Sequence, residues 1–421
     1  MKDSGVKWIG EIPEDWKVEK AKLIFEQRNT KGNENAVLLS ATQANGMYPQ
    51  SLLEGVVQVK VDTDLNTFKT VHKNDFVISL RSFQGGFEMS DYEGVCSPAY
   101  QVFYNKVPIC HKYYKLLFKS QGFISYINSL VVGIREGKNI QYSSFSYSEV
   151  PVPPLAEQTR ISNYLDSKCT EIDELVKLEE RMITELQKYK QSVITETVTR
   201  GLNKTAKLKD SGVEWIGMIP EEWGVGKVSY FYEITLGKML QPNKKENDDA
   251  LYPYICAVNL GNNKLKMNNL REMWFSKEEI ANYQIKNGDL LVVEGGDVAS
   301  SDIVSKLTDE IIGIQNAVHL VRSNRNYSLR YLRYYLIFIK SIGYIDLICN
   351  RATISHFTKE KFSNLPILVV SIDEQERISS YLDKKTEEID GLIKLKESKI
   401  QGLKDYKKSL IYEYVTGKKK V

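Results

Sequence analysis

The sequence predicts an α+β protein in which two mixed α/β domains are joined by two long antiparallel coiled-coil helices in a pseudo-twofold arrangement. Three observations predict this fold. The chain of 421 residues contains an internal repeat, each repeat ends in a segment with helical spacing of apolar residues, and the regions between the repeated blocks alternate strand and turn patterns. A chain of this length is long enough for two or three domains that each bury a core.

Two pairs of matching blocks carry the repeat. Residues 3–16 read DSGVKWIGEIPEDW, and residues 210–223 read DSGVEWIGMIPEEW. Farther along, EQTRISNYLD at 157–166 matches EQERISSYLD at 374–383. We therefore expect two similar scaffolds, each built from an opening block and a helical block.

The regions between the repeated blocks differ from each other. Residues 20–145, the first variable region, and residues 227–362, the second variable region, share a rough pattern but little identity. The strand candidates are 75–80, 99–104, 289–293 and 317–321, and the helix candidates are 112–118 and 328–339. The predicted domains are residues 1–152 and 204–369, and the predicted helical segments are 153–203 and 370–421.

Each helical block predicts one helix of roughly 40 residues, or about 60 Å at ~1.5 Å per residue. Apolar residues recur at spacings of three and four, and a helix of this kind needs a partner for its apolar seam. We expect that partner to be the other copy, and the alternative is that each helix packs on its own neighbouring domain. The seam residues are Ile172, Val176, Ile183, Leu186, Tyr189, Val193, Ile389, Ile393, Ile400, Leu403, Tyr406 and Leu410.

The composition excludes several classes of protein. Five scattered cysteines without a CxxC pair argue against a disulfide framework or a zinc site and favour a reducing cytoplasm. The four histidines form no metal-binding pattern, so no metal is expected. The N-terminal residues MKDSGVKW contain no apolar signal core, and no run of apolar residues is long enough to cross a membrane.

No catalytic motif stands out in the sequence. The only Pro pair, in VPPL at 152–155, lacks the aromatic residue with which amino-methyltransferases grip a flipped base, and no GxxxxGK[ST] phosphate loop exists. The net charge of +3 is weak evidence about partners, whereas 25 tyrosines suit either an interface or a Tyr-rich core. We expect a chain that catalyses nothing itself.

The two-copy layout resembles the specificity subunits of type I restriction-modification systems. The residues that carry the resemblance are KDSGVKWIGEIPEDW, PVPPLAEQ and the EQxRISxYLDxK helix, and the resemblance covers essentially the whole chain. The second copy departs from the pattern, because it reads LPILVVSIDEQ at 365–375 without the Pro pair.

The resemblance implies two target recognition domains that each read one half of a split, asymmetric site in double-stranded DNA. It also implies that two methyltransferase subunits dock on the scaffold, and that restriction and translocation subunits can join them. The partner would bind S-adenosylmethionine, and this chain would hold no cofactor. The helix pair would set the spacer, because each base pair adds ~3.4 Å of duplex.

Candidate DNA-reading residues follow from the chemistry of base edges. Arginine suits guanine, and Asn or Gln suits adenine, whereas Lys138 and Lys238 are expected at phosphates. The alternative for each residue is a solvated loop position. The candidates are Arg81, Ser82, Gln84, Arg135, Lys138, Asn139, Gln141, Lys238, Gln241, Gln315, Asn316, Arg351, Ser355 and His356.

Several alternatives remain open from the sequence. Trp8, Trp16, Trp215 and Trp223 either dock a partner or, as we favour, anchor each domain to its helix. The assembly is either a restriction complex or a modification-only or regulatory methyltransferase assembly. Other classes are a free-standing enzyme and a structural coiled-coil adaptor, which would show no site-dependent DNA binding.

Overall fold

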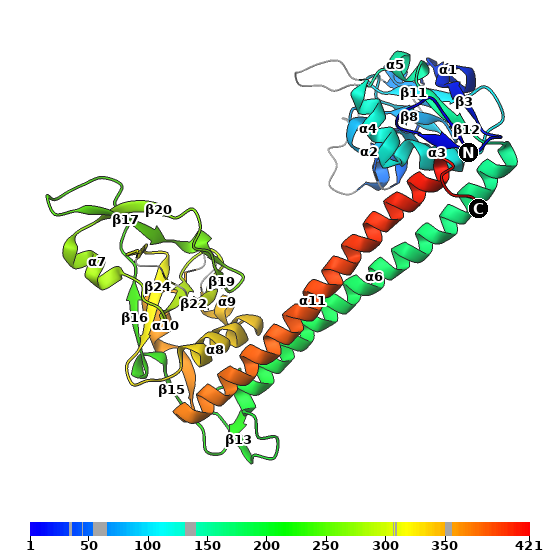
Figure 1. The fold of residues 1–421 in the computed structure, drawn as a ribbon. Helices are drawn as coiled ribbons and strands as arrows, with labels where there is room; N and C mark the ends of the chain where they lie inside the picture. The colour runs from blue at the N-terminus through cyan, green and yellow to red at the C-terminus, as the bar shows by residue number, and fades with distance from the viewer. Residues whose placement is uncertain are drawn as a thin grey trace. The chain divides into compact units, whose positions relative to one another are not determined.

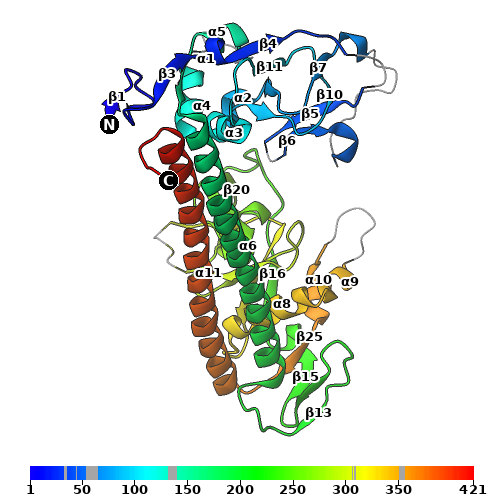
Figure 2. The same ribbon diagram turned by 90° about the vertical axis from the view of Figure 1, so that its right-hand side faces the viewer.

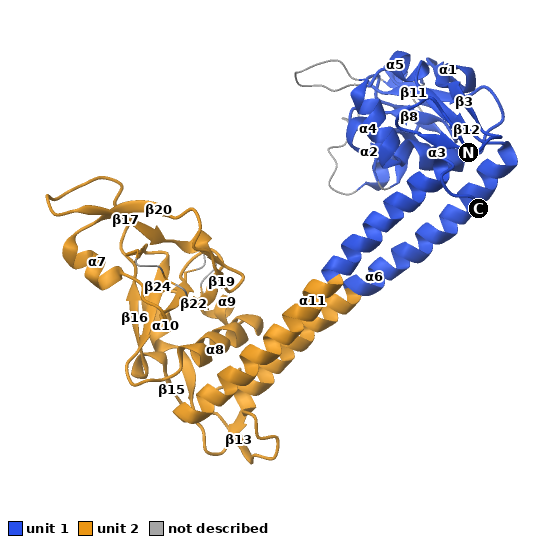
Figure 3. Ribbon diagram, viewed as in Figure 1, with its two compact units in different colours: residues 1–180, 397–421 blue, residues 181–396 orange. Residues whose placement is uncertain are grey.

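The computed structural model describes residues 1–32, 36–43, 45–53, 65–130, 140–305, 307, 310–349 and 356–421. These residues form two compact units (Figure 3). Unit 1 consists of residues 1–180 and 397–421, and unit 2 consists of residues 181–396. Each unit therefore holds one variable region and half of each long helix. The two helices are α6 (Leu155–Arg200) and α11 (Ile372–Val415) (Figure 1).

Unit 1 is built around an antiparallel four-stranded sheet in the order β4-β11-β8-β9. Its strands are β4 (Phe25–Arg28), β11 (Gln101–Asn105), β8 (Phe76–Ile78) and β9 (Glu88–Met89). The two-stranded pairs are β1 (Lys2–Asp3) with β2 (Glu11–Ile12), β3 (Lys17–Lys20) with β12 (Glu149–Val152), β5 (Leu39–Thr42) with β6 (Gly46–Pro49), and β7 (Lys69–Val71) with β10 (Gly94–Cys96). The helices are α1 (Ala21–Ile24), α2 (Ser82–Gly85), α3 (His111–Lys119), α4 (Gln121–Ser129), α5 (Tyr142–Ser146), η1 (Gln50–Leu52) and η2 (Leu65–Thr67).

Unit 2 repeats this plan around a sheet in the order β16-β24-β21-β22. Its strands are β16 (Tyr232–Leu236), β24 (Val318–Ser323), β21 (Leu290–Val293) and β22 (Ser301–Ile303). A second sheet has the order β20 (Arg271–Phe275), β17 (Ala250–Ile255) and β23 (Gly313–Ile314), and the remaining pairs are β13 (Leu208–Asp210) with β14 (Met218–Pro220), β15 (Gly224–Lys227) with β25 (Pro366–Val369), and β18 (Leu260–Gly261) with β19 (Lys264–Leu265). The helices are α7 (Lys277–Tyr283), α8 (Leu329–Ser341), α9 (Tyr344–Ile348), α10 (Lys359–Asn364), η3 (Val228–Tyr230) and η4 (Ala257–Asn259).

The core of unit 1 is a cluster of buried aromatic rings on the four-stranded sheet. Phe25 lies edge-on to Phe103, with ring centroids 5.4 Å apart, and Phe87 lies edge-on to Phe145 at 4.9 Å. Edge-to-face packing at this distance is the favoured geometry for aromatic pairs and adds to the gain from burial. The rings come from strands and helices far apart in sequence, so they fasten the helices to the sheet.

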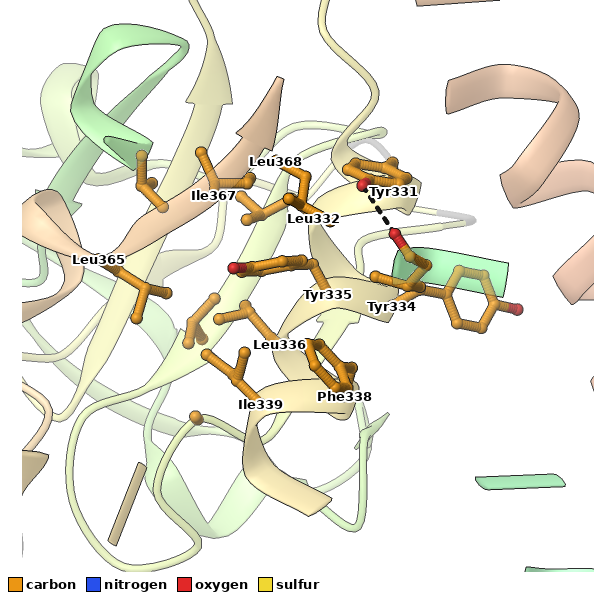
Figure 4. Close-up of a cluster of buried hydrophobic side chains, with 14 of the residues drawn as sticks. Tyr331, Leu332, Tyr334, Tyr335, Leu336, Phe338, Ile339, Leu365, Ile367 and Leu368 are labelled. Atoms are coloured by element: carbon orange, nitrogen blue, oxygen red, sulfur yellow. Dashed lines mark hydrogen bonds between the residues drawn. The ribbon is translucent and has the colours of Figure 1, made fainter. Parts of the chain in front are cut away.

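The core of unit 2 joins α8 to the sheet and to the helix pair (Figure 4). Tyr331 and Tyr335 are fully buried, and their hydroxyls donate to backbone carbonyls of Val198 in α6 and Pro366 in β25. Each hydroxyl is satisfied, as a buried polar group requires. This helix therefore ties the second variable region to the scaffold.

The predicted pairing of the two long helices is confirmed within each unit. In unit 1, Lys407 of α11 bonds Asp173 of α6 at 2.6 Å, and in unit 2, Lys190 bonds Asp390 at 2.8 Å. These residues are equivalent in the repeat, so the same ion pair is made once in each unit. As the number of the α6 residue rises, that of its α11 partner falls, which makes the helices antiparallel (Figure 2).

Ten of the twelve predicted seam residues are buried or half-buried. Six are buried: Ile172, Val176, Val193, Ile389, Ile400 and Leu410. Ile183, Leu186, Ile393 and Leu403 are half-buried. Tyr189 and Tyr406 are a correction, because they are 51% and 55% exposed. Each directly precedes a lysine that occupies the seam, so the tyrosine ring falls on the flank.

The opening blocks of the repeat cover the C-terminal ends of the helices. In unit 1, Trp16 is buried and packs with Pro13 against Gly417, the residue of positive φ after α11. In unit 2, Trp223 packs against Gly201, the corresponding residue after α6. Trp16 and Trp223 thus anchor the domains to the helices, as predicted, whereas the ring of Trp8 stacks on Tyr126 of α4 and that of Trp215 stacks on Tyr344 of α9.

The remaining sequence-predicted elements are also found. The strand candidates overlap β8, β11, β21 and β24, and the helix candidates overlap α3 and α8. The boundaries differ by at most two residues, as is usual for element ends. In the described part of the chain, no helix combines the length and apolar character needed to cross a membrane.

Candidate nucleic-acid interface

Most of the described candidate residues gather at one end of the central sheet in each unit. In unit 1, Arg28 at the end of β4 pairs with Val102, and Ile78 at the end of β8 pairs with Gln101. Because the strands are antiparallel, the chain leaves β4 and β8 where it enters β11. We call the residues beyond this edge, 79–87, 97–101 and 141, sheet end 1.

Unit 2 has the corresponding edge. Leu236 at the end of β16 pairs with His319, and Val293 at the end of β21 pairs with Val318. We call the residues beyond it, 237–241, 294–300, 315–317 and 356, sheet end 2. The equivalence of the two edges is a consequence of the shared strand order and register.

Arg81 and Gln84 lie on the surface of sheet end 1. Both are exposed at helix α2, where the Gln84 N–H donates to the Arg81 carbonyl at 2.9 Å. Ser82 differs, because it is 1% exposed and its Oγ accepts from the Ser79 N–H at 2.8 Å. The hydroxyl of Ser82 thus holds the turn after β8, and Arg81 and Gln84 are the side chains open to a ligand.

Gln141 belongs to a chain of three glutamine amides. Its Oε1 accepts from Nε2 of Gln101, and the Gln101 Oε1 in turn accepts from Nε2 of Gln27 at 3.0 Å. The backbone N–H of Tyr142 donates to the same oxygen at 3.1 Å. Gln141 is exposed, whereas Gln101 and Gln27 are half-buried. The sequence reasoning identified Gln141 but not its two supporting residues.

Sheet end 2 brings Lys238, Gln315 and Asn316 together. The Asn316 N–H donates to the Lys238 carbonyl at 2.8 Å, and Nε2 of Gln315 donates to Oδ1 of Asn316 at 2.7 Å. Both amide side chains are half-buried. They form a paired polar surface with hydrogen-bonding capacity left over for a base edge.

Lys238 and Gln241 have a different setting from the one expected for phosphate or base contacts. Nζ of Lys238 donates to Oε1 of Gln241 at 2.8 Å and to the Glu279 carboxylate, and Nε2 of Gln241 donates to Oδ2 of Asp249 at 2.8 Å. Both side chains are 7% exposed. Their polar atoms therefore hold the loop after β16 in place.

The charges of this network shift the pKa values of its carboxylates. Hydrogen bonds from backbone N–H groups, with help from Gln241, lower the pKa of Asp249. Burial alone would raise the pKa of Glu279, but the hydrogen bonds from Lys238 and from the Ser276 N–H, together with the charge of Lys238, outweigh burial and lower it. Both carboxylates therefore stay ionised and keep the lysine paired.

His356 lies beside the turn after β21. It forms a bridge with Gly295, and the next residue, Phe357, donates its N–H to the Glu294 carbonyl at 2.8 Å. Burial raises the pKa of Glu294, and His356 partly offsets this. Five candidates lie outside the described residues: Arg135, Lys138, Asn139, Arg351 and Ser355. Within the described ranges, no group of three or more His, Cys, Asp or Glu side chains is arranged to hold a metal ion.

Sheet end 2 also carries two exposed apolar residues that the sequence reasoning did not single out. Met239 is 75% exposed and Leu240 is 54% exposed, next to Lys238. Apolar side chains contact the methyl group of thymine or enter the stack between base pairs. The sequence did contain a signal for Met239 and Leu240, because two adjacent apolar residues between Lys238 and Gln241 are unusual in a polar loop.

Comparison with known families assigns the chain. A family model described as type I restriction modification DNA specificity domain matches residues 1–188 and 220–404. The chain belongs to this family. One match of the specificity domain falls in each copy of the repeat, so the resemblance inferred from the motifs is confirmed.

Specificity subunits are also among its relatives. The putative type I restriction enzyme MjaX specificity subunit of Methanocaldococcus jannaschii is 24% identical over 445 residues, covering 98% of this chain and 96% of the relative. The type I restriction enzyme EcoKI specificity subunit of Escherichia coli is 24% identical over 173 residues, covering 41% of this chain and 35% of the relative.

Solved structures share the fold of the specificity family. The HsdS subunit from Thermoanaerobacter tengcongensis has a TM-score of 0.59 at 14% identity, covering 97% of this chain and 98% of that one. A chain from a study of complex assembly and conformational transition of the type I R-M system has a TM-score of 0.70 at 14% identity, covering 96% and 98%. The predicted fold class is thereby confirmed.

Proposed function

We propose that this specificity-family chain reads a bipartite, asymmetric DNA target and presents it to two methyltransferase subunits. The observation that carries the proposal is the doubled architecture. The same four-stranded sheet occurs twice on matching scaffolds, while the residues at the two sheet ends differ. A protein that recognises one DNA target with two different half-sites needs two matching scaffolds that carry different recognition residues.

The sheet ends have the chemistry of base readout. Sheet end 1 offers Arg81, Gln84 and Gln141, and sheet end 2 offers Gln315 and Asn316 beside apolar side chains. Arginine and amide side chains make the bidentate contacts that distinguish base pairs in the major groove. The asymmetry of the proposed target follows from the difference between the two sets.

Each variable region is inserted at a single point of the scaffold. In unit 1, Lys20 at the end of β3 pairs with Glu149 at the start of β12. In unit 2, Lys227 at the end of β15 pairs with Pro366 at the start of β25. The chain thus leaves and re-enters the scaffold at adjacent positions, which supports a modular role for each region.

The helix pair supports docking of two copies of one partner. Unit 1 exposes Leu175 and Tyr406, and unit 2 exposes their repeat equivalents Leu392 and Tyr189. Each of these residues directly precedes a seam position, so in each unit the leucine and the tyrosine flank the same side of the helix pair. Exposed apolar residues that occur as matched sets are typical of interaction surfaces.

We assign the chemistry of the assembly to the partner. The methyltransferase would bind S-adenosylmethionine and transfer the methyl group to adenine, and this chain would catalyse nothing. Restriction and translocation subunits would join the same complex in the cytoplasm.

The test is to map modified adenines in a genome after co-expression with the methyltransferase. We expect one split, asymmetric motif, and no modification from either protein alone. Exchanging residues 228–365 for those of another family member should change one half of the motif only. A change in both halves, or methylation without a motif, would overturn the proposal.

A further inference from the structure

We infer that Gln141 contacts a base edge as a hydrogen-bond donor, and that Gln101 is the positioning residue that fixes this polarity. The inference rests on the proposed function, because it assigns the chemistry by which sheet end 1 selects a base. It commits to a class of partner atom: an acceptor on the base edge, such as N7 or O6 of guanine or O4 of thymine.

The direction of the amide chain is fixed by the backbone of Tyr142. A backbone N–H can only donate, so the Gln101 atom 3.1 Å from it is the oxygen. Nε2 of Gln27 donates to the same oxygen at 3.0 Å, which occupies its second lone pair. The amino group of Gln101 is therefore the part that faces Gln141.

The polarity of Gln141 follows from that of Gln101. An amino group donates, so the Gln141 atom that meets it is the acceptor Oε1. The amino group of Gln141, with two N–H donors, is left facing away, and in the described ranges of the chain no residue accepts a hydrogen bond from it. Gln141 is an exposed side chain held in one orientation, which lowers the entropy that binding would cost.

This orientation selects among bases. A free glutamine contacts adenine with its oxygen and its amino group together, the first accepting from N6 and the second donating to N7. In Gln141 the oxygen is turned toward Gln101, so only donors remain for the ligand. Acceptor-rich edges are thus favoured over the mixed edge of adenine and over the N4 donor of cytosine.

At the start of β24, the corresponding place in unit 2, the side chains make a different hydrogen bond. Gln101 pairs with the last residue of β8, and the residue that pairs with the last residue of β21 is Val318 of β24, which has no side-chain amide and is followed by His319. Nε2 of His319 donates to the Phe357 carbonyl at 2.7 Å, and the ring is fully buried. Neither Val318 nor His319 has a side-chain amide that could orient a second glutamine. The base contact proposed for Gln141 is therefore specific to the first variable region.

Two isosteric substitutions test the polarity. Gln141→Glu replaces the outward donors by an acceptor. Gln101→Glu still accepts from Tyr142 and Gln27 but has no N–H to offer, so Gln141 must turn its own amino group toward it and present Oε1 outward. Both variants should shift the preferred base, by roughly tenfold, toward one with an N–H donor, at the same single position of one half-site. The readout is the base frequency at each position among methylated sites, after co-expression with the methyltransferase.

Two further variants separate readout from structure. Gln187→Glu makes the same change at an exposed helix position and should leave the motif unchanged. Gln141→Ala removes all hydrogen bonding and should relax the choice at that same position only. If Gln141→Glu abolishes methylation, a Gln141→Ala protein relaxed at one position still supports the inference.

Three results would overturn the inference. One is a wild-type motif from both glutamate variants, the second is a uniform loss across all positions, and the third is an inactive alanine variant. The proposed function would survive each of them as long as the wild-type motif is split and exchange of a variable region alters one half. If that exchange fails, the failure lies with the proposed function and not with Gln141.

Discussion

At the scale of single residues, buried and half-buried polar side chains fix the sheet ends by hydrogen bonding to the backbone of neighbouring segments. Tyr142 donates its N–H to Gln101 in unit 1, and Phe357 accepts from His319 in unit 2. A carbonyl only accepts, so Nε2 of His319 carries the hydrogen and Nδ1 is a bare acceptor. This Nδ1 is buried without a partner among the described residues. Such a ring is stable only while it is neutral.

His319 predicts a pH-dependent stability of unit 2. Burial lowers its pKa below the ordinary value of 6.5, and the hydrogen bond to Phe357 offsets only part of this effect. The unfolded chain therefore takes up the proton first as the pH falls. The contribution of His319 is fully present above pH 6.5 and is lost as the pH falls through the lower folded pKa.

His319→Gln keeps a donor for the Phe357 carbonyl but cannot titrate. We expect its melting temperature to fall less than that of the unmodified protein between pH 7.5 and pH 5.5. His72→Gln, which removes an exposed histidine, is the control and should follow the unmodified protein. Equal slopes for His319→Gln and the unmodified protein would show that His319 does not titrate in this range.

At the scale of elements, the helices combine an internal seam with an outer surface of similar composition. Ile172 and Ile389 are buried between the helices, whereas Leu175 and Leu392, three residues farther along, are nearly half exposed. Ion pairs of Lys190 with Asp390 and of Lys407 with Asp173 fix the register in each unit. The seam holds the scaffold together, and the flank is the surface that we propose for docking of the methyltransferase.

Substitutions at matched positions should separate these two roles. Ile389→Ala in the seam should lower the free energy of unfolding by about 2–4 kcal/mol, because it leaves a cavity. Leu175→Ala and Leu392→Ala should change it by less than about 0.5 kcal/mol but should weaken binding of the methyltransferase. Chemical denaturation and calorimetric titration measure the two effects. Unchanged binding by the double leucine variant would place the docking surface elsewhere.

The long helices and their pairing were predictable from the sequence because their pattern is regular and repeated, whereas contacts between distant side chains of the variable regions were not. The spacing of apolar residues predicted one long helix within residues 153–203, and α6 spans Leu155–Arg200. In contrast, Lys238 was expected at phosphate, but it is buried with Glu279, which is 41 residues away. Gln101 and Gln27 are 74 residues apart and were missed. A side chain that another strand will cover looks the same in sequence as one that stays exposed.

At the scale of the whole molecule, α6 and α11 each run through both units, so their length enters the proposed spacing of the two half-sites. We expect insertion of four residues into both helices, after Glu180 and after Lys396, to lengthen each by ~6 Å. At ~3.4 Å per base pair, the spacer in the methylated motif should grow by about one to two base pairs with both half-sites unchanged. Sequencing of modified adenines measures this directly. An unchanged spacer would mean that the helices do not set it.

In each unit an opening block of the repeat packs at the C-terminal end of a long helix, but the connection between block and helix differs. In unit 2, the opening block 208–223 packs at the end of α6 and is joined to it through residues 201–207. In unit 1, residues 1–16 pack at the end of α11 without a covalent link, where Tyr412 donates to the Trp8 carbonyl at 2.8 Å and Lys418 to the Ile9 carbonyl at 2.8 Å. Residues 1 and 421 therefore belong to one unit, and the order of the repeat is circular.

This circular order predicts that the chain tolerates permutation. A chain that begins at Thr205, joins residue 421 to residue 1 through a flexible linker of about six residues and ends at Lys204 keeps every packing contact described for both units. We expect it to melt within a few degrees of the parent and to direct methylation to the same split motif. A second permutant, opened within the α6 seam between Ile183 and Thr184, should lose both properties because it breaks a paired helix. If the first permutant folds but directs methylation to a different motif, the contact of residues 1–16 with α11 does not determine how the two variable regions recognise DNA.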